Sequence, residues 1–290
     1  MTELADLFEP HRAYLAGLAY RMLGSVAEAE DVVQDAYLRW QARTDDEEIA
    51  TPRAFLSRIV TRLCLDRLKS ARVRREQYVG TWLPEPLVGD TAPRPDAPMA
   101  LADDLSVALL VTLERLSPLE RAAFLLHDVF EMELDQIAGI LERSEAAVRK
   151  LASRAREHVR TGRPRFEASR EASERLTRAF QAAMAAGDAT ALSQLLAEDA
   201  VFYSDGGGKR SAAVNPIYGR DKIVRFFMGI AVKLGGPPDP RTLQRTTING
   251  QPGFLVHSPD GVETLALEIS GDHIAAIYDV RNPDKLRHLV

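Results

Sequence analysis

The sequence has a single cysteine, Cys64, among its 290 residues. One cysteine excludes an intrachain disulfide and any metal site that needs several cysteine ligands. No apolar run approaches the roughly 20 residues that a membrane-spanning helix needs. The first ten residues also lack the basic and then apolar pattern of an export signal. We therefore expect a cytoplasmic protein without a cofactor, a metal ion or membrane contact.

An excess of positive charge is also missing, because 37 Lys and Arg residues stand against 42 Asp and Glu residues, for a formal net charge of -5. The sum does not exclude a nucleic-acid partner. Basic residues are concentrated at Arg67–Arg75 and Arg143–Arg165, and acidic residues at Glu28–Asp35 and Asp45–Glu48. A protein with local basic patches can bind a polyanion while it remains acidic overall.

Residues 1–78 carry apolar side chains at helical spacing and show no strand pattern, which predicts an all-helical unit. Its second helix bears the acidic face Glu28–Asp35. Its third begins at Thr51-Pro52 and ends in the basic stretch Arg67–Arg75. The acidic face is either a partner surface or an ordinary solvated face. The basic stretch either contacts phosphates or only stabilises the helix C-terminus.

Two short amphipathic helices joined by a tight turn are predicted over Met132–Arg156. The first carries apolar residues at i, i+3, i+4 and i+7 from Leu134, and Ser144 is suited to cap the second. The other faces of the second helix are basic. This is the pattern of a helix-turn-helix, whose second helix enters the DNA major groove. A helical hairpin with a solvated basic face has the same pattern.

Between these units, Gly80–Pro98 holds five of the 16 prolines, which is typical of an extended, semi-rigid linker. Its large apolar side chains Trp82, Leu83 and Leu87 favour docking over a plain tether, because leaving each in water forfeits roughly 1.5–3 kcal/mol. After residue 170 the pattern changes to helices, one of them at Tyr218–Val232, followed by strands. Helices and then an antiparallel meander predict an α+β domain.

Several stretches resemble motifs of one family. AEAEDVVQDAYLRW at Ala27–Trp40 is similar to the polymerase-binding helix in region 2 of bacterial extracytoplasmic-function sigma factors, and Ala54–Glu76 to the next segment, which melts the promoter and reads its −10 element. Leu113–Arg160 resembles region 4 of the same class. WLPEPL in the linker, YSDGGGK at Tyr203–Lys209 and NPDKL at Asn282–Leu286 resemble motifs of a subgroup that carries a fused C-terminal SnoaL-like domain.

The resemblance implies a multidomain fold. Two all-α domains, the second with the helix-turn-helix, would precede an α+β cone of the SnoaL-like or ketosteroid-isomerase-like type. We expect a region 2-like domain at 1–78, a proline-rich linker at 79–98, a region 4-like domain at 99–162 and the cone at 170–290. The function implied is not enzymatic. It is a subunit that directs RNA polymerase core to specific promoters and opens their DNA, with the cone as a regulator in cis.

The resemblance also implies site residues, position by position. Those expected to bind the polymerase are Asp31, Gln34, Asp35 and Leu38. Those expected to face the −10 element are Arg58, Arg62, Arg67, Lys69 and Arg72, with the loop Thr44–Ala50 holding a flipped base. Those expected to face the −35 element are Glu145, Ala146, Arg149, Lys150 and Arg154. The regulatory interface would join Trp82, Leu83, Pro84, Asp205, Gly206, Gly207, Gly208, Lys209, Asn282, Pro283, Asp284 and Lys285.

The implied partners are the β′ clamp and β flap of RNA polymerase core, and promoter DNA. One departure concerns the helix-turn-helix turn, where many members have glycine and this chain has Glu142. A left-handed backbone there costs about 1 kcal/mol more for glutamate. Two other functions stay open. One is a one-component transcription factor. The other is a SnoaL-like enzyme or ligand sensor fused to a DNA-binding region, with acid–base candidates Tyr203, Asp205, His257 and Asp279.

Overall fold

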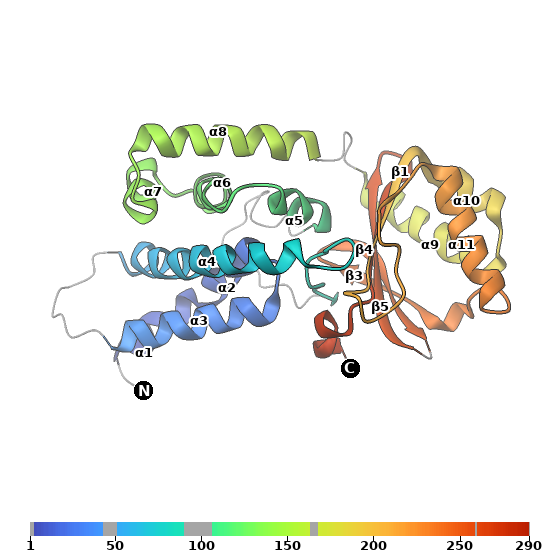
Figure 1. Ribbon diagram of the computed structural model, residues 1–290, viewed down its shortest axis with the longest axis horizontal. Coiled ribbons are helices and arrows are strands. Elements are labelled where there is room, and N and C mark those ends of the chain that lie inside the picture. The colour runs from blue at the N-terminus through green and yellow to red at the C-terminus, as the bar shows by residue number, and fades with distance from the viewer. Residues whose placement is uncertain (1–2, 43–50, 90–105, 163–167, 259, 290) are drawn as a thin grey trace. The chain divides into compact units, whose positions relative to one another are not determined.

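The computed structural model describes residues 3–42, 51–89, 106–162, 168–258 and 260–289 of the chain. The chain divides into two compact units. The first comprises residues 1–76, 93–105 and 109–162, and the second comprises 77–92, 106–108 and 163–290. Figure 1 shows the helices of the first unit and the sheet with its helices in the second. The part of the linker that is described therefore belongs with the C-terminal unit.

The N-terminal part of the first unit consists of α1 (Glu3–Phe8), a 3₁₀ turn (Glu9–His11), α2 (Arg12–Leu23), α3 (Val26–Gln41) and α4 (Pro52–Glu76). Helix α2 ends because Gly24 adopts a left-handed conformation with φ 69°. Ser25 then caps α3 by accepting the amide of Glu28 at 3.2 Å. The apolar stripes of these helices form one core around Leu18, Val33 and Leu56, which are all buried. The expectation of an all-helical unit is confirmed.

The remaining helices of the first unit are α5 (Val107–Glu114), α6 (Pro118–Phe124) with a π-helical turn (Leu125–Val129), α7 (Leu134–Leu141) and α8 (Glu145–Gly162). A capping box begins α6, because the Ser117 hydroxyl accepts the amide of Glu120 and the Glu120 carboxylate accepts the amide of Ser117. Helix α8 packs on α6. Its buried residues recur every three or four positions, as a single helix face requires: Val148, Ala152, Ala155 and Val159.

The two groups of helices pack against each other within the first unit, with α4 against α6 and α7. Tyr14 of α2 makes an edge contact with Phe130, at 4.9 Å between ring centroids. The buried Arg121 of α6 donates to the carbonyl of Met22 in α2 at 2.6 Å and to Glu114 at 2.7 Å. A buried arginine bound in this way joins the region 2-like helices to the region 4-like helices.

The second unit is an α+β domain with a mixed six-stranded sheet. Its helices are α9 (Arg170–Ala186), α10 (Ala189–Leu195) and α11 (Arg220–Lys233). Its strands are β1 (Leu196–Asp205), β2 (Ile217–Tyr218), β3 (Leu243–Ile248), β4 (Gln251–Ser258), β5 (Gly261–Ser270) and β6 (His273–Val280), in the order β2-β1-β6-β5-β4-β3. Strands β1 and β6 are parallel, and the other neighbours are antiparallel. Short 3₁₀ turns precede β3 (Pro240–Thr242) and end the chain (Pro283–Lys285 and Arg287–Leu289).

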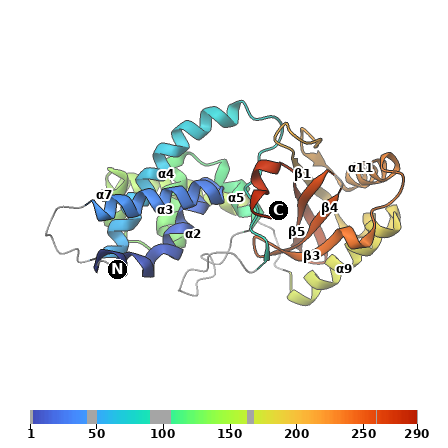
Figure 2. The same cartoon turned by 90° about the horizontal axis from the view of Figure 1, so that it is seen from below.

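The three helices cover one face of this sheet (Figures 1 and 2). Between helices and sheet lies an aromatic core in which Phe180, Phe202 and Phe254 are almost fully buried. Phe180 stacks on Phe254 with 5.7 Å between ring centroids. Because side chains alternate along a strand, Phe202 and Ser204 of β1 face the helices while Asp205 faces the other way.

One sequence-based boundary is wrong. The helix expected at Tyr218–Val232 begins at Arg220, and Tyr218 instead lies in the short strand β2, where it pairs with Val201 of β1. Gly219, with φ 92°, separates the strand from the helix. Two residues of strand are too few to give an alternating pattern, which is why the sequence analysis placed Tyr218 in the helix. No helix in the described ranges is long and apolar enough to cross a membrane.

Candidate functional site

The acidic face of α3 is exposed, and a basic side chain from α4 is bound to it. Arg67 donates to Asp31 at 3.3 Å and to Asp35 at 3.0 Å. Gln34 is exposed, and the apolar Leu38 is 55% exposed, so this face combines acidic, amide and apolar groups. Residues expected to contact two different partners are therefore joined by ion pairs here.

The other residues expected to face the −10 element differ in their surroundings. Arg58 is exposed on α4. Arg62 forms an ion pair with Glu142 at 2.5 Å, and Lys69 pairs with Asp66 at 2.9 Å. The side chain of Arg72 and the loop Thr44–Ala50 lie outside the described residues, so their expected contacts stay predictions.

Helices α7 and α8 form the helix-turn-helix that the sequence pattern indicates. Glu142 ends α7 in a left-handed conformation (φ 54°, ψ 48°), so the turn carries the backbone strain that a glutamate has there. The Ser144 hydroxyl accepts the amide of Ala147 at 3.3 Å, which confirms it as the cap of α8. The left-handed residue and the cap together set the angle between the two helices.

The outer face of α8 is exposed and carries every residue expected to face the −35 element: Glu145, Ala146, Arg149, Lys150 and Arg154. Two arginines of α8 are bound to α6 and the turn after it, since Arg154 pairs with Glu120 at 3.3 Å and Arg156 with Asp128 at 2.6 Å. Arg149 and Lys150 make no side-chain ion pair within the described part of the chain. These two side chains are the ones most available to an external anion or base.

A second candidate site lies in the C-terminal unit, where three motifs meet at the buried carboxylate of Asp205. Its Oδ2 accepts the amide of Leu83 at 2.8 Å and the ammonium of Lys285 at 2.7 Å. Its Oδ1 accepts the hydroxyl of Tyr78 at 2.5 Å and the amide of Gly207 at 3.0 Å. One carboxylate thus ties the linker to the turn after β1 and to the C-terminal segment.

Lys285 adds three more contacts to the same cluster. Its ammonium also donates to the carbonyl of Leu83 and lies over the ring of Trp82, at 4.2 Å from the ring centroid. The ring of Tyr78 is 5.1 Å from the same nitrogen. Such cation–π contacts stabilise a charge that burial has deprived of water.

Close packing or backbone conformation favours glycine at all three glycines of the turn after β1. A Cβ atom at Gly206 would lie 2.1 Å from the carbonyl oxygen of Arg210, and one at Gly207 would lie 2.3 Å from the Asn282 side chain. Gly207 and Gly208 also have positive φ angles of 59° and 71°. Lys209 then pairs with Asp284, so this turn is held against the C-terminal segment.

Further along the linker, backbone groups extend the contact. The amide of Leu87 donates to the Asn249 side chain at 3.1 Å, and the amide of Asn249 donates to the carbonyl of Leu87 at 2.7 Å. The imidazole of His288 lies 2.9 Å from the carbonyl of Pro86. The linker residues 82–88 therefore lie along the sheet edge and the C-terminus as a docked strap.

Tyr78 is the member of this cluster that sequence reasoning missed. It donates to Asp205 and accepts a hydrogen bond from Asn282 at 2.8 Å. Burial, reinforced by the neighbouring carboxylate of Asp205, raises the pKa of Tyr78 above its ordinary range. Tyr78 lies before the linker motif at Trp82–Leu87, and no local sequence pattern marks it.

The expected acid–base candidates do not form one constellation. Tyr203 stacks on Tyr278 with 5.2 Å between ring centroids, and Asp205 holds the linker. His257 and Asp279 instead line a cavity of about 530 Å³ beneath the helices. Among the described residues, no group of three or more His, Cys, Asp or Glu side chains is placed to hold a metal ion.

Comparison with known proteins bears on both sites. Family models match two parts of the chain: Sigma-70 region 2 at residues 7–74 and Sigma-70, region 4 at residues 106–159. The chain is 42% identical to the ECF RNA polymerase sigma factor SigJ of Mycobacterium tuberculosis, over 96% of this chain and 91% of that protein. It is 38% identical to the probable ECF RNA polymerase sigma factor SigI of the same species, over 95% and 92%. The crystal structure of Mycobacterium tuberculosis SigJ matches with a TM-score of 0.79 and 37% identity, and 98% of each chain is covered.

Proposed function

The chain belongs to the extracytoplasmic-function RNA polymerase sigma factors, and we propose that it directs RNA polymerase core in the cytoplasm to specific promoters through separate surfaces on its two helical groups. The observation that carries this proposal is the match of both sigma-70 regions in order, combined with exposed charged faces on α3, α4 and α8. The acidic and apolar face of α3 suits a protein partner. The basic faces of α4 and α8 suit DNA.

The polymerase surface is proposed to be the α3 face with Asp31, Gln34, Asp35 and Leu38. An exposed leucine among acidic groups supports this assignment, because interfaces combine an apolar anchor with a polar rim. Arg67 is held by the two aspartates, so it orients them and also keeps the basic end of α4 near them.

On α8, Arg149 and Lys150 are proposed to read or grip the −35 element. Arginine bidentate to guanine is the commonest base-specific contact in the major groove. Arg154 and Arg156 are engaged with acidic residues of the region 4-like group, so we assign them to positioning α8. On α4, Arg58 is the exposed candidate for the −10 strand.

We propose that the described first unit is a closed resting form. The −10 and −35 elements are about 25 base pairs apart by name, which is roughly 85 Å of B-form DNA at about 3.4 Å per pair. Here a −10 candidate, Arg62, touches the helix-turn-helix turn at Glu142. The two surfaces must therefore separate before both elements are bound together.

The C-terminal unit is proposed to regulate this separation in cis. The linker joins the two helical groups along the chain, and its residues 82–88 are docked on the sheet and the C-terminal segment through Asp205 and Lys285. A docked linker has a fixed path, so the C-terminal unit sets how the helical groups can move apart. Catalysis is no part of the proposal, because the acid–base candidates divide between two separate places.

The promoter-specificity proposal is tested by run-off transcription with purified core polymerase across a promoter library. We expect the double variant Asp31→Lys/Asp35→Lys and the single variant Leu38→Ser each to weaken core binding at least tenfold. Leu38→Ser leaves Arg67 paired, so it separates loss of the surface from disturbance of α4. Asp221→Lys, at an exposed site on α11, is the control. Unchanged transcription by both variants would overturn the proposal and favour a factor that uses only its helix-turn-helix.

The regulatory proposal is tested with Lys285→Met, which keeps the apolar stem and removes the ammonium that binds Asp205. We expect at least a threefold change in transcription from a matched promoter, with a matching change in core affinity. Lys222→Met, at an exposed site of α11, controls for loss of charge. Equal activity of Lys285→Met and the wild-type protein, with linker docking shown to be lost, would remove the basis for regulation in cis.

A further inference from the structure

The docked strap, residues 82–88, carries a single acidic side chain, Glu85. It stands between Pro84 and Pro86, so its backbone is constrained on both sides. A proline ring fixes its own φ angle, and the residue before a proline is restricted to an extended conformation. The side chain of Glu85 is only 10% exposed. The strap therefore presents this carboxylate in one direction, and little conformational entropy is lost when it is bound.

The imidazole of His288 faces the strap with both of its nitrogen atoms. Its Nε2 lies 2.9 Å from the carbonyl oxygen of Pro86, and its Nδ1 lies 3.4 Å from Oε1 of Glu85. The ring belongs to the 3₁₀ turn Arg287–Leu289, which follows the buried Leu286. An oxygen atom that can accept a hydrogen therefore stands opposite each ring nitrogen.

This arrangement fixes the number of protons in the contact. A carbonyl oxygen only accepts, so Nε2 carries a proton. A neutral imidazole would then turn the lone pair of Nδ1 toward the carboxylate of Glu85, which is repulsive. One more proton between the two atoms removes the repulsion, whether it stays on Nδ1 or on the carboxyl group. The docked pair therefore holds one proton more than a neutral histidine and a separate carboxylate.

We propose that the contact between His288 and Glu85 is a pH-sensitive latch, which holds the strap more tightly in acid. The extra proton is bound more tightly in the docked state, where both nitrogens meet acceptors, than in the undocked state, where the ring is in water. The latch therefore contributes in full below the range in which histidine titrates, around pH 6.5, and this contribution is lost as the pH rises.

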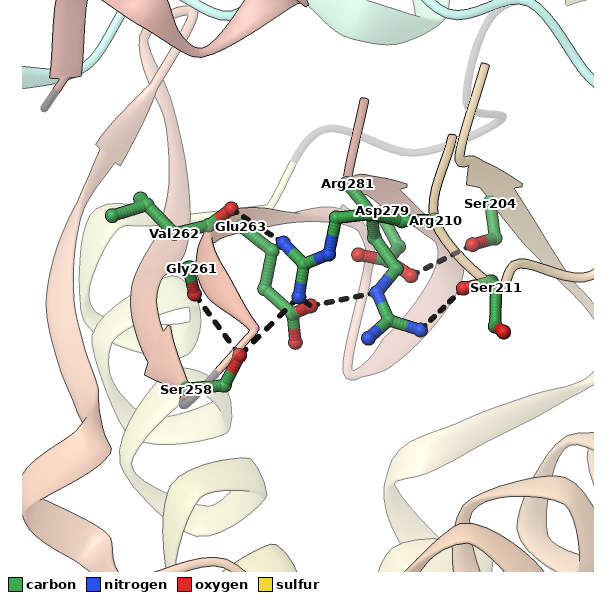
Figure 3. A network of polar contacts seen from close by, with 9 residues as sticks. All are labelled: Ser204, Arg210, Ser211, Ser258, Gly261, Val262, Glu263, Asp279 and Arg281. Carbon is green, nitrogen blue, oxygen red and sulfur yellow. Dashed lines mark hydrogen bonds and ion pairs between the residues drawn. The ribbon is translucent and has the colours of Figure 1, made fainter. Parts of the chain in front are cut away.

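Other ion pairs of the same unit are built from permanent cations. Arg281 and Arg210 both donate to the carboxylate of Glu263, at 2.7 Å and 3.3 Å (Figure 3). Lys285 binds Asp205 at 2.7 Å. Arginine and lysine stay protonated between pH 5 and 8. These contacts keep their cations over the range in which the latch gains or loses its proton.

The charged and titratable side chains of the segments around the latch have partners of their own. Tyr78 and Lys285 bind Asp205, Lys209 and Arg287 bind Asp284, Glu268 on the sheet face that bears Asp205 accepts the hydroxyl of Tyr278, and Tyr203 stacks on Tyr278. Hydrogen bonds from Lys209 and Arg287 also hold the pKa of Asp284 below its ordinary value. His288 is the histidine among these groups, so we assign the titration near neutral pH to it.

The latch goes beyond the proposed role in transcription. It concerns only the docking of the strap on the C-terminal segment, and docking can be measured without polymerase or DNA. Loss of promoter-specific activity would leave the latch intact, and a strap without pH dependence would leave the role in transcription intact.

The test is hydrogen exchange of the full chain at pH 5.5 and pH 7.5. The amides of Leu83 and Leu87 report docking, because they donate to Asp205 and Asn249. Their protection factors divide the intrinsic exchange rate at each pH by the observed rate, so the direct effect of pH on exchange cancels. We expect the ratio of protection at pH 5.5 to that at pH 7.5 to be at least threefold larger in the wild type than in His288→Gln.

The variants separate the latch from other sources of pH dependence. Glutamine at position 288 can still donate to the Pro86 carbonyl but does not titrate. Glu85→Gln keeps the size of the side chain and removes its charge, so its ratio should fall in the same way. His273→Gln changes an exposed histidine at the start of β6 and should keep the wild-type ratio. Asp279 is present in all of these proteins, so its own effect on stability is common to them.

Thermal melts establish that each variant is folded. Equal ratios in the wild type and His288→Gln would overturn the proposal, and so would weaker protection of the wild type at pH 5.5 than at pH 7.5. If His288→Gln loses docking at both pH values, Glu85→Gln decides: a wild-type ratio in that variant would overturn the latch.

Discussion

Two contacts hold distant stretches of this chain together, and they are built in opposite ways. In the C-terminal unit, the linker is bound through Asp205, which is fully buried, and Lys285, whose side chain is 13% exposed. In the helical unit, Arg62 and Glu142 join α4 to the helix-turn-helix with side chains 38% and 72% exposed. One charge pair is enclosed by protein and the other is exposed to water.

The difference predicts which contact persists. Removing one partner of a buried, hydrogen-bonded pair costs about 3–5 kcal/mol, whereas an exposed pair contributes about 0–1 kcal/mol. A second contact between the helical groups is the buried Arg121, which donates to the carbonyl of Met22, and not all of its donors are used. Burial lowers the pKa of Arg121 to about 10, and its Nε atom has no hydrogen-bond partner among the described residues. Separation of the two helical groups would expose Arg121 to water. We therefore expect these groups to separate more readily than the linker leaves Asp205 and Lys285.

The largest effect is expected from Asp205→Ala, which leaves the Lys285 ammonium buried without its carboxylate. We expect the free energy of unfolding of the C-terminal unit to fall by about 3–5 kcal/mol in urea titrations. Asp205→Asn should lose less, because its amide oxygen can still accept the amide of Leu83. An exposed ion pair in the same unit offers the control, since Asp272→Ala, which removes the partner of Arg175, should cost under about 1 kcal/mol.

Fluorescence of Trp82 distinguishes undocking from general unfolding. The chain has two tryptophans, and Trp40 is buried in the first unit. In a Trp40→Phe background, Asp205→Ala should shift the emission of Trp82 to longer wavelength, because the linker leaves the sheet. An unshifted spectrum at equal stability loss would show that Asp205 supports the sheet and not the linker contact.

A smaller loss is expected when the turn after β1 is overpacked. Gly206→Ala places a methyl group 2.1 Å from the carbonyl oxygen of Arg210, which should cost roughly 1–3 kcal/mol. The matched control is Gly229→Ala in α11, where the added methyl meets nothing within 4 Å. That change should stabilise the helix by up to about 1 kcal/mol. Equal effects of the two substitutions in thermal melts would count against the close contact.

The third expected effect is a pH dependence of stability, and it arises from Asp279, which lines the cavity. The folded-state pKa of Asp279, about 8, lies above the ordinary value of 3.8. The folded state therefore holds a proton that the unfolded state releases between those values. Stability should fall as pH rises through this window, by up to about 1.4 kcal/mol per pH unit. Urea unfolding from pH 5 to 8 should show this slope in the wild type and not in Asp279→Asn.

The smallest effect is expected at Glu142, where two contributions oppose each other. Glu142→Gln removes the exposed ion pair and should cost under about 1 kcal/mol. Glu142→Gly removes the same pair but relieves the left-handed backbone by about 1 kcal/mol, so it should be neutral or stabilising. Spin labels on cysteines introduced at Leu38 and Arg149 then report separation of the helical groups. Both variants should broaden the distance distribution, and a narrow distribution in both would contradict a contact poised to open.

The helices were predictable because their signals are local. Ser144 caps α8 as the sequence indicated, and the turn between the two helices falls at Glu142. The expected order of helices and then a meander is confirmed, with β3, β4, β5 and β6 as consecutive antiparallel neighbours. The short strand β2 was missed because two residues carry no period. The two linker leucines did find buried positions, as the apolar content of the linker indicated.

The partners of individual side chains were beyond the sequence. Motifs indicated that the linker, the turn after β1 and the C-terminus belong together, but not that Asp205 is the common acceptor or that Tyr78 completes the cluster. The pairing of Arg67 with the acidic face of α3, instead of with solvent, was also unforeseen. Such contacts join residues that are tens to hundreds of positions apart and depend on register.

The sequence by itself determined the helical periods, the caps, the meander and the family, because each of these is carried by residues close together in the chain. Tertiary structure alone decided the state of the charged groups. It enclosed Asp205 in an ion pair with a lysine and bound Asp279 to a serine hydroxyl, although both are aspartates in strands of one sheet. The physical reason is that the ionisation of a side chain depends on its water and its neighbours, and folding supplies both.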